Sequence, residues 1–525
     1  MNYLKIGKAT ELSGRNRILY RFFEVIPGLL SVSTILILLF FSYFQPVWVA
    51  FFIIAFNIYW LLLVIYLAVH LLTAYNKLKK NSKVNWKEKC QELKSRDDLP
   101  SDCLAKNNVD WHKLWQLIIL PTYNEDINII RSSLNSILKD NYPLERKIVV
   151  LAMEERAGQI AKERAKIIEN EFANKFGFFK ITFHPGDIAG ELKGKGSNQA
   201  WAIKQAKRDI IDENNLDYNK ILVSVFDIDT VVYSGYFFAL SYQFLSVSSP
   251  YRASYQPVPV YHNNVWQAPF FSRVAAASNT FWQMMMQVRD EMLVTYSSHS
   301  MTFKALVDID FWSTKMVSED SRIFWHCLLF YNGDYRVVPL YFPVSMDITE
   351  GKSFLQTAKN LYKQQRRWAW GSENIPYLMF NTLKRWKRVE KKKLIKHILI
   401  QIYGFHSWAT NALIIAVIGW MPLILGGDRF TSTVLSGNLP TITSYFMSFA
   451  MVGLFTSSII SFLLLPKKPK RVSRFRKLFM ILEWVFIPVT IILFGAIPCL
   501  DAQIRLLRGK YMGFWVTPKT RSNKN

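Results

Sequence analysis

Two apolar stretches near the N-terminus constrain this chain more than any other feature. Residues 26–44 and 47–72 are almost entirely apolar, and only Gln45 and Pro46 separate them. A helix of about 20 apolar residues is long enough to cross the hydrocarbon core of a bilayer. The interruption is too short to hold a domain. The pattern therefore predicts a transmembrane helical hairpin over residues 26–72.

Basic residues flank this hairpin on both outer sides. They are Lys5, Lys8, Arg15, Arg17 and Arg21 before it, and Lys77, Lys79, Lys80 and Lys83 after it. Because basic residues accumulate on the cytoplasmic side of membrane helices, both flanks are expected there. This places an N-terminal segment, 1–25, and a linker, 73–110, in the cytoplasm of a protein of the inner or plasma membrane.

Three further apolar stretches lie within a predicted transmembrane region, 405–500. The connection 426–440 carries only Asp428 and Arg429 as charges, whereas the next connection holds seven basic residues between 467 and 477. The first connection is therefore expected outside and the second in the cytoplasm. The last stretch, 478–500, contains Glu483 and two prolines, which are costly at bilayer depth. We expect it to enter the membrane and return, leaving a cytoplasmic tail over 501–525.

Composition narrows the class of protein and its partners. The net charge is +26, half of the residues are hydrophobic and 20% are charged, which suits a polar domain joined to membrane segments. Because the basic residues cluster beside apolar stretches, membrane lipids are the expected anionic partner and nucleic acid is not. The four cysteines include no CxxC pair, so a thiolate metal site or disulfide framework is unsupported.

Between the membrane regions the pattern changes to short strands and amphipathic helices. Residues 117–120, 148–151 and 221–226 are β-rich, and helical patterns cover 127–138 and 197–206. This alternation predicts an α/β catalytic domain over 111–345, with a mostly parallel, Rossmann-like sheet whose ligand site lies at the carboxyl ends of its strands. Residues 346–404 are expected to form interfacial helices.

Two acidic motifs could carry chemistry. Asp227 and Asp229 follow the most apolar strand, where paired carboxylates can bind a hard divalent cation and, with it, a diphosphate. Glu319 and Asp320 include a carboxylate that could accept a proton from an attacking hydroxyl. Taken alone, the first motif is also compatible with a solvated loop and the second with an ordinary helix start.

Three other motifs suit phosphate and sugar binding. Gln364 to Trp368 reads QQRRW, which offers a guanidinium fork for phosphate oxygens and a flat ring for a sugar, but is also typical of a basic interfacial anchor. PTYNE at 121–125 directly follows the first core strand. KGKGSN at 193–198 precedes a helix, where glycines and lysines favour an anion.

The order PTYNE, KGKGSN, DID, SED, QQRRW resembles that of the processive family-2 membrane glycosyltransferases, which include cellulose, chitin and hyaluronan synthases. FWVTPK at 514–519 is similar to the gating loop of cellulose synthases. The resemblance covers residues 117–519. It implies an inverting hexosyltransferase that extends a polysaccharide from a nucleotide-sugar, a UDP-hexose or UDP-N-acetylhexosamine, with Mg²⁺ or Mn²⁺.

The resemblance also implies a role for each motif residue. Asp320 is the catalytic base, with Glu319 beside it. The donor is bound by Thr122, Tyr123, Glu125, Glu154, Lys195, Asp227, Asp229 and Arg367. Asp227 and Asp229 also hold the metal. The saccharide acceptor contacts Gln364 and Trp368, and the gating residues are Phe514, Val516, Thr517 and Lys519.

Two departures from the family pattern affect specificity. The second core strand ends in Glu154 and Glu155 where the family has an aspartate, and we prefer Glu154 as the substitute. Residues 297–300, Ser-Ser-His-Ser, lack the glycine-containing acceptor motif. Transfer of a single sugar to a lipid carrier and a non-enzymatic transporter remain alternatives.

Overall fold

The α/β domain is built on one mixed sheet. The computed structural model describes residues 3–107, 109–473 and 475–519, and within these ranges eight strands pair in the order β3-β2-β1-β4-β7-β6-β8-β5. The strands are Trp115–Pro121 (β1), Lys147–Glu154 (β2), Phe178–His184 (β3), Ile221–Val225 (β4), Val231–Val232 (β5), Ala253–Val260 (β6), Ser300–Thr302 (β7) and Arg336–Ser345 (β8). The pairs β3-β2, β2-β1, β1-β4 and β6-β8 are parallel, which confirms the predicted fold class.

Alternate residues of the central strands point to opposite faces of the sheet, and each face is covered by helices. Leu117 and Ile119 belong to one buried cluster, whereas Ile118 and Leu120 belong to another. The domain's helices are Trp86–Glu92 (α3), Ile127–Lys139 (α4), Gly158–Phe172 (α5), Lys195–Ala206 (α6), Tyr236–Ser246 (α7), Phe270–Val288 (α8), Phe303–Asp308 (α9), Glu319–Phe330 (α10), Phe354–Ala369 (α11) and Asn374–Lys384 (α12). Because β1, β2 and β4 are parallel, their carboxyl ends lie at the same edge of the sheet.

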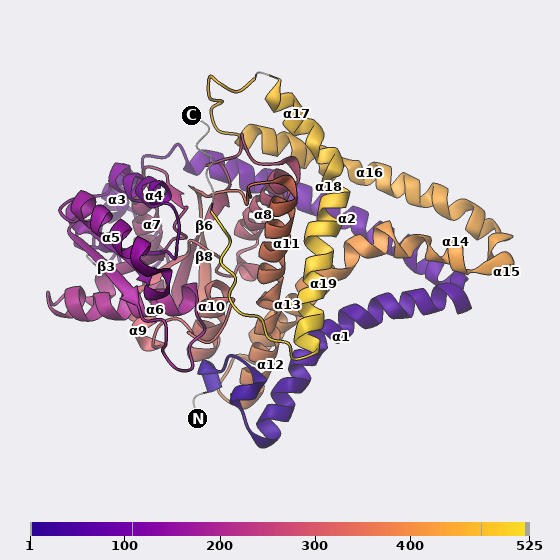
Figure 1. The fold of residues 1–525 in the computed structure, drawn as a ribbon, viewed down its shortest axis with the longest axis horizontal. Helices are drawn as coiled ribbons and strands as arrows, with labels where there is room; N and C mark the ends of the chain where they lie inside the picture. Colours follow the sequence, from indigo (N-terminus) through magenta and orange to yellow (C-terminus); the bar gives the residue numbers. More distant parts are fainter. Residues whose placement is uncertain (1–2, 108, 474, 520–525) are drawn as a thin grey trace.

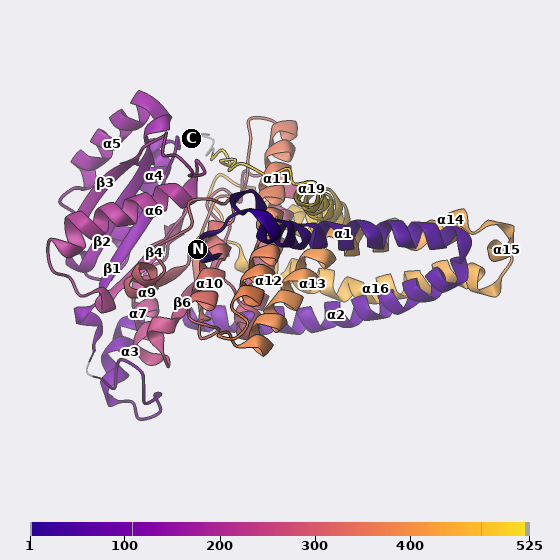
Figure 2. The same cartoon turned by 90° about the horizontal axis from the view of Figure 1, so that it is seen from below.

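Five helical segments of the described chain are long and apolar enough to cross a membrane. They are Gly14–Phe44 (α1), Pro46–Asn81 (α2), Lys391–Ala416 (α13), Val434–Leu464 (α16) and Arg476–Leu507. Short helices Met421–Leu425 (α14) and Gly427–Thr431 (α15) connect α13 to α16. In both views α1, α2 and α16 extend along the long axis of the molecule, away from the α/β domain (Figure 1, Figure 2).

The last segment differs from the predicted re-entrant stretch. Residues 476–507 form consecutive helical pieces, Arg476–Leu482 (α17), Ile487–Ile491 (α18) and Ile497–Leu507 (α19), joined by the 3-10 turn Glu483–Phe486 and the π turn Ile492–Ala496. They form a rod that crosses the direction of α1 and α16 (Figure 1) and is seen nearly end-on in Figure 2. The helix is interrupted at Glu483 and at Ile492, as the prediction of a broken segment requires. The chain does not turn back on itself, so the predicted return is wrong.

Contacts with the α/β domain explain this placement. Glu483 accepts hydrogen bonds from the guanidinium of Arg273 in α8, at 2.9 Å from Nε to Oε2, and both side chains are nearly buried. Phe271 stacks on Phe494 with ring centroids 5.3 Å apart. The carboxylate that would be costly in lipid thus has a cation from the domain. The helix lies along the domain instead of turning back on itself.

Breaking this ion pair is expected to destabilise the protein. Arg273→Met removes the guanidinium that is paired with the Glu483 carboxylate, and breaking a buried ion pair in this way costs about 3 kcal/mol or more. Thermal unfolding of the purified protein in detergent measures the loss. Arg131→Met is the matched control because the Arg131–Glu171 pair is about one-third exposed on each side, and such pairs contribute about 0–1 kcal/mol. Equal melting temperatures for the two variants would contradict this account.

The N-terminal segment and the tail meet beside α1. Glu24, on α1, is buried and accepts hydrogen bonds from the backbone N–H of Ala9 at 3.1 Å and from the Tyr511 hydroxyl at 2.8 Å. Arg21 pairs with Glu24 and donates to the carbonyl of Leu506 at 2.7 Å. The N-terminal segment, α1 and the tail are therefore joined through one carboxylate.

Candidate active site

The carboxyl end of β4 carries the two aspartates of the DID motif. The strand ends at Val225, and Phe226 still donates its N–H to the carbonyl of Ile119 at 3.0 Å. Asp229 is fully buried, and its Oδ2 accepts the backbone N–H of Asp347 at 2.9 Å. Its Oδ1 has no hydrogen-bond partner among the residues that the structure describes. A buried acceptor without a partner is uncommon and costly, so this oxygen is a candidate ligand atom.

Lys195 joins the two acidic motifs. Its Nζ lies 2.7 Å from Asp227 Oδ1, and 2.9 Å and 2.8 Å from the two carboxylate oxygens of Asp320. Glu319 Oε1 is 3.8 Å away. Lys195 is the first residue of α6, and Asp320 lies in the first turn of α10. Segments from three distant parts of the sequence therefore meet at one ammonium group.

Neighbouring acids in this cluster have very different pKa values. Burial opposes ionisation of Asp227, but the Lys195 and Lys519 ammonium groups outweigh it, so the pKa of Asp227 lies below its usual range. Burial raises the pKa of Glu319 to about 8, and the charge on Asp320 adds to this increase. Near neutral pH, Glu319 is therefore mainly protonated, whereas Asp227 is ionised. Acids with such different pKa values side by side are typical of functional sites.

The tail reaches this cluster. Lys519 Nζ lies 2.8 Å from Asp229 Oδ2, and burial raises the pKa of Asp229 despite this ammonium group. Phe514 packs on Gly194 so closely that an added Cβ there would lie 2.5 Å from the ring. The Thr517 side chain is buried, and Val516 is partly buried. The four predicted gating residues thus lie along a path from Gly194 to Asp229.

Helix α11 brings the QQRRW motif alongside the tail. The guanidinium of Arg367 lies 5.0 Å from the centre of the Phe514 ring, and the Nζ of Lys363 lies 5.2 Å from the Trp515 ring. Gln364 is buried and accepts a hydrogen bond from the Thr349 hydroxyl at 2.7 Å. The neighbouring Trp368 side chain is half-buried. The motif therefore packs against the tail in this state.

The predicted nucleotide-binding residues form a separate group after β1 and β2. Glu125 accepts hydrogen bonds from the Thr122 hydroxyl and the Tyr123 N–H, each at 2.7 Å, so its carboxylate stabilises this loop. Glu154 is buried at the end of β2 and pairs with Arg156, whose guanidinium lies 4.3 Å from the Tyr123 ring. Glu155, the other candidate, is exposed.

Sequence reasoning missed several polar partners of the acids. The Ser297 hydroxyl donates to Asp227 Oδ2 at 2.8 Å, and Asn263 donates to the carbonyl of Asp229 at 2.8 Å. His299 is buried, its Nδ1 lies 3.9 Å from Asp320 Oδ1, and burial lowers its pKa. Residues 297–300 stood out in the sequence only as a departure from a family pattern. Their position beside β4 follows from the β4-β7 pairing, which the sequence does not reveal.

The oxygen atoms of Asp227 and Asp229 are the candidate ligands for a divalent cation. Within the described ranges, no three histidine, cysteine or acidic side chains gather closely enough to hold a metal by themselves. Asp227 and Asp229 nevertheless offer oxygen ligands, and Asp229 Oδ1 is free for one. Lys195 and Lys519 supply the positive charge at these carboxylates in the structure. This arrangement fits Mg²⁺ or Mn²⁺ taking its remaining ligands from a bound diphosphate and water.

Comparisons with known proteins give distant matches only. No family model and no curated protein matches the sequence. Among solved structures, a mannosyltransferase from Pyrobaculum calidifontis, in complex with GDP-Man and Mn²⁺, is 12% identical and has a TM-score of 0.38, covering 74% of this chain and 99% of its own. Residues 1–349 of S. aureus TarS, in complex with UDP-GlcNAc, are 14% identical with a TM-score of 0.35, covering 66% and 90%. Both TM-scores are below 0.5, so these structures carry no argument about function. The function of this chain is inferred from its own contacts.

Proposed function

We propose that this chain is a membrane-embedded glycosyltransferase that transfers a sugar from a nucleotide-sugar to a saccharide acceptor, with inversion, and extends a polysaccharide. The convergence of the DID and SED motifs on Lys195 supports this proposal most strongly. It brings the acids suited to a cation–diphosphate and the acid suited to proton transfer within reach of one amine. Inverting transfer needs both groups at one reacting centre.

Asp320 is the base in this proposal. Its carboxylate is ion-paired with Lys195 and partly exposed, so it is available to an acceptor hydroxyl. Glu319 is buried, and its pKa of about 8 keeps it mainly protonated at neutral pH. A protonated acid cannot accept the proton of an attacking hydroxyl. Of the two neighbouring acids, Asp320 therefore removes the proton while the sugar–phosphate bond breaks.

Asp227 and Asp229 hold the donor side of the site. When bound, Mg²⁺ or Mn²⁺ would neutralise the charge that develops on the departing nucleotide diphosphate. Asp229 is fixed by the N–H of Asp347 and Asp227 by the hydroxyl of Ser297, so both carboxylates are oriented before a ligand binds. Arg367 offers a guanidinium for the same diphosphate. Thr122, Tyr123 and Glu154 face the nucleoside in this proposal.

The acceptor and the tail complete the site. Trp368 supplies a flat face for the terminal sugar and Gln364 a polar contact. The tail lies across the donor side, and Lys519 pairs with the carboxylate assigned to the cation. Donor binding therefore requires Lys519 to leave Asp229, which agrees with a gating role for Phe514, Val516, Thr517 and Lys519.

A donor screen tests the proposal. The purified full-length protein in lipid nanodiscs is incubated with UDP-glucose, UDP-N-acetylglucosamine or GDP-mannose, with Mg²⁺ or Mn²⁺. Nucleotide release and product size are then measured. We expect release with at least one donor and a product of many sugars. A product of one sugar on lipid would favour the lipid-carrier alternative, and the absence of release with every donor would overturn the proposal.

The proposal also requires the active site to face the cytoplasm, where nucleotide-sugars are made. Accessibility of introduced cysteines tests this, because the four native cysteines are buried. In sealed cells a membrane-impermeant maleimide is expected to label Asp428→Cys, in the connection α15, but not Lys510→Cys, in the tail. Permeabilised cells should show labelling at both positions. The reverse pattern in sealed cells would contradict this orientation.

A further inference from the structure

A buried carboxylate outside the acidic cluster lies directly behind the SED motif. Glu373 ends the 3-10 turn Trp370–Glu373 (η11), which follows α11, and only 7% of the residue is exposed. Its Oε1 accepts hydrogen bonds from the Ser318 backbone N–H at 3.1 Å and from the Ser318 hydroxyl at 2.7 Å. Its Oε2 accepts the indole N–H of Trp370 at 2.8 Å. Glu373 has no assigned role in the proposed sugar transfer.

Ser318 is the N-cap residue of α10, directly before its first residue, Glu319. The first turn of a helix has backbone N–H groups without partners inside the helix, and the N-cap side chain commonly accepts one of them. Here the Ser318 side chain makes no such bond and donates to Glu373 instead. The Glu373 carboxylate thus supplies an acceptor, and a negative charge, at the N-terminus of α10. Glu319 and Asp320 are the next two residues.

Asn374, the residue after Glu373, also contacts the start of α10. Arg322, one turn into α10, donates from Nε to Asn374 Oδ1 at 2.6 Å and from Nη1 to the carbonyl of Ile6 at 3.0 Å. Asn374 in turn donates to the Ser321 hydroxyl at 2.9 Å. Two successive residues after α11, Glu373 and Asn374, therefore hold the first turn of α10.

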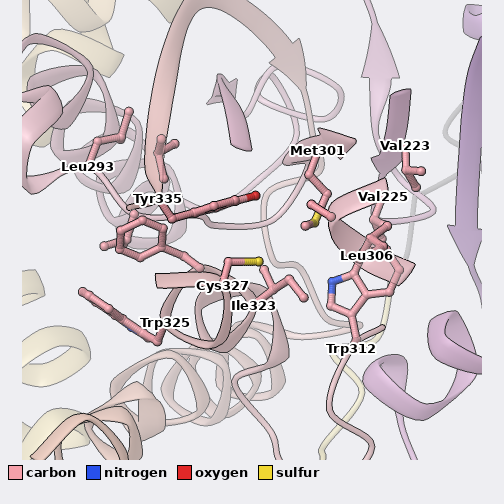
Figure 3. Close-up of a cluster of buried hydrophobic side chains, with 14 of the residues drawn as sticks. Val223, Val225, Leu293, Met301, Leu306, Trp312, Ile323, Trp325, Cys327 and Tyr335 are labelled. Carbon is pink, nitrogen blue, oxygen red and sulfur yellow. The ribbon is translucent and has the colours of Figure 1, made fainter. Parts of the chain in front are cut away.

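The rest of α10 is held by apolar packing. Figure 3 shows Ile323 and Cys327 pointing into the buried cluster that also contains Met301, Trp312 and Val225 of β4. This packing fixes the body of the helix but leaves the direction of its first turn to polar contacts. Burial raises the pKa of Glu373, against the charge of Arg322, so its hydrogen bonds to Ser318 form in a nearly dry environment.

We propose that Glu373 is a positioning residue that sets the location of Asp320 and links it to the helix carrying Gln364, Arg367 and Trp368. This inference rests on the proposed function. Asp320 must lie within hydrogen-bond reach of the acceptor hydroxyl, and the acceptor is bound by α11. A rigid connection from the end of α11 to the start of α10 keeps the Asp320 carboxylate at a constant position relative to the bound acceptor.

The test combines substitutions at both ends of the connection. Glu373→Ala removes the acceptor of both Ser318 bonds and is expected to lower kcat about 10²-fold, because a small misplacement of a catalytic group costs about that much. The KM for the donor should change little. Glu373→Gln keeps a carbonyl oxygen for Ser318, so it should restore kcat to within about tenfold of the wild type. Rates are measured as nucleotide release from the donor identified in the screen.

A double-mutant cycle separates positioning from general loss of stability. Ser318→Ala alone should lower kcat, and adding it to Glu373→Ala should cause little further loss, since both remove one connection. Asp140→Asn is the matched control, because Asp140 is also buried and caps a helix, accepting the N–H of Gly235 at 2.8 Å, but lies away from the base. When Ser318→Ala is combined with Asp140→Asn, the fold reductions in kcat of the two single variants should multiply.

Several outcomes would overturn the inference without touching the proposed function. They are an unchanged kcat in Glu373→Ala, multiplicative effects of Glu373→Ala and Ser318→Ala, or a Glu373→Gln variant as slow as Glu373→Ala. If Glu373→Ala does not fold, Ser318→Ala decides: a lowered kcat with an unchanged donor KM would support the connection, and an unchanged kcat would overturn it. A wild-type protein that releases no nucleotide from any donor refutes the proposed function instead.

Discussion

Asp320→Asn is expected to lower the rate of sugar transfer by about 10²- to 10⁴-fold, the range typical for loss of a general base. Asparagine keeps the size of the side chain and can still face Lys195, but it cannot accept the proton of the acceptor hydroxyl. Donor affinity should survive, because the diphosphate and nucleoside are assigned to other residues. Single-turnover transfer and equilibrium donor binding, measured on the same preparation, check the two halves of this expectation.

Two comparisons make this result specific. Asp212→Asn, an exposed acid paired with Lys207 on the surface, should transfer sugar at the wild-type rate. Glu319→Gln should lose less activity than Asp320→Asn, because Glu319 is already mainly protonated below its pKa of about 8. A Glu319→Gln variant slower than Asp320→Asn would instead assign the base to Glu319.

Asp229→Asn is expected to abolish turnover with either Mg²⁺ or Mn²⁺. The substitution replaces a buried carboxylate, whose Oδ1 has no partner in the described chain, by a neutral amide, which weakens the binding of a hard cation and of the diphosphate. Metal-dependent donor binding, followed by calorimetry, should disappear together with activity. This readout does not depend on catalysis.

The control for this variant is another acid paired with basic side chains. Asp209 pairs with Lys180 and Arg208 at the domain surface, and Asp209→Asn should bind donor and metal as the wild type does. Both variants should elute from size-exclusion chromatography at the same volume as the wild type. Near-normal turnover by Asp229→Asn, or full wild-type activity with excess chelator, would exclude the metal assignment.

The elements that were predicted correctly are those whose structure is determined by residues close together in the sequence. The strands β1, β2 and β4 are continuous apolar runs, and they lie within a few residues of the predicted ranges. The DID motif directly follows β4 because the chain leaves a parallel sheet at that edge. These local signals were sufficient for the α/β class and for the position of Asp227 and Asp229.

Elements fixed by distant contacts were not predictable. The glutamate and prolines of segment 476–507 correctly indicated interruptions of its helix but also suggested a return that does not occur. Arg273, about 200 residues earlier, supplies the cation that Glu483 needs. Glu373 gave no signal either, since a single glutamate after an aromatic helix is compatible with many surface turns. Its significance depends on Ser318, which only the folded chain brings to it.

The contact between α1 and α19 has a consequence for biosynthesis. Gly28 approaches the carbonyl of Gln503 so closely that an added Cβ would lie 2.6 Å from the oxygen, and the Ser31 hydroxyl bonds Gln503 Oε1 at 2.7 Å. The partners are 472 residues apart in sequence. Residue 31 therefore leaves the ribosome long before residue 503 has been made. During that interval the first membrane helix must reside in the bilayer with its glycine face and serine hydroxyl uncovered, held by lipid or by a chaperone until translation supplies the matching surface.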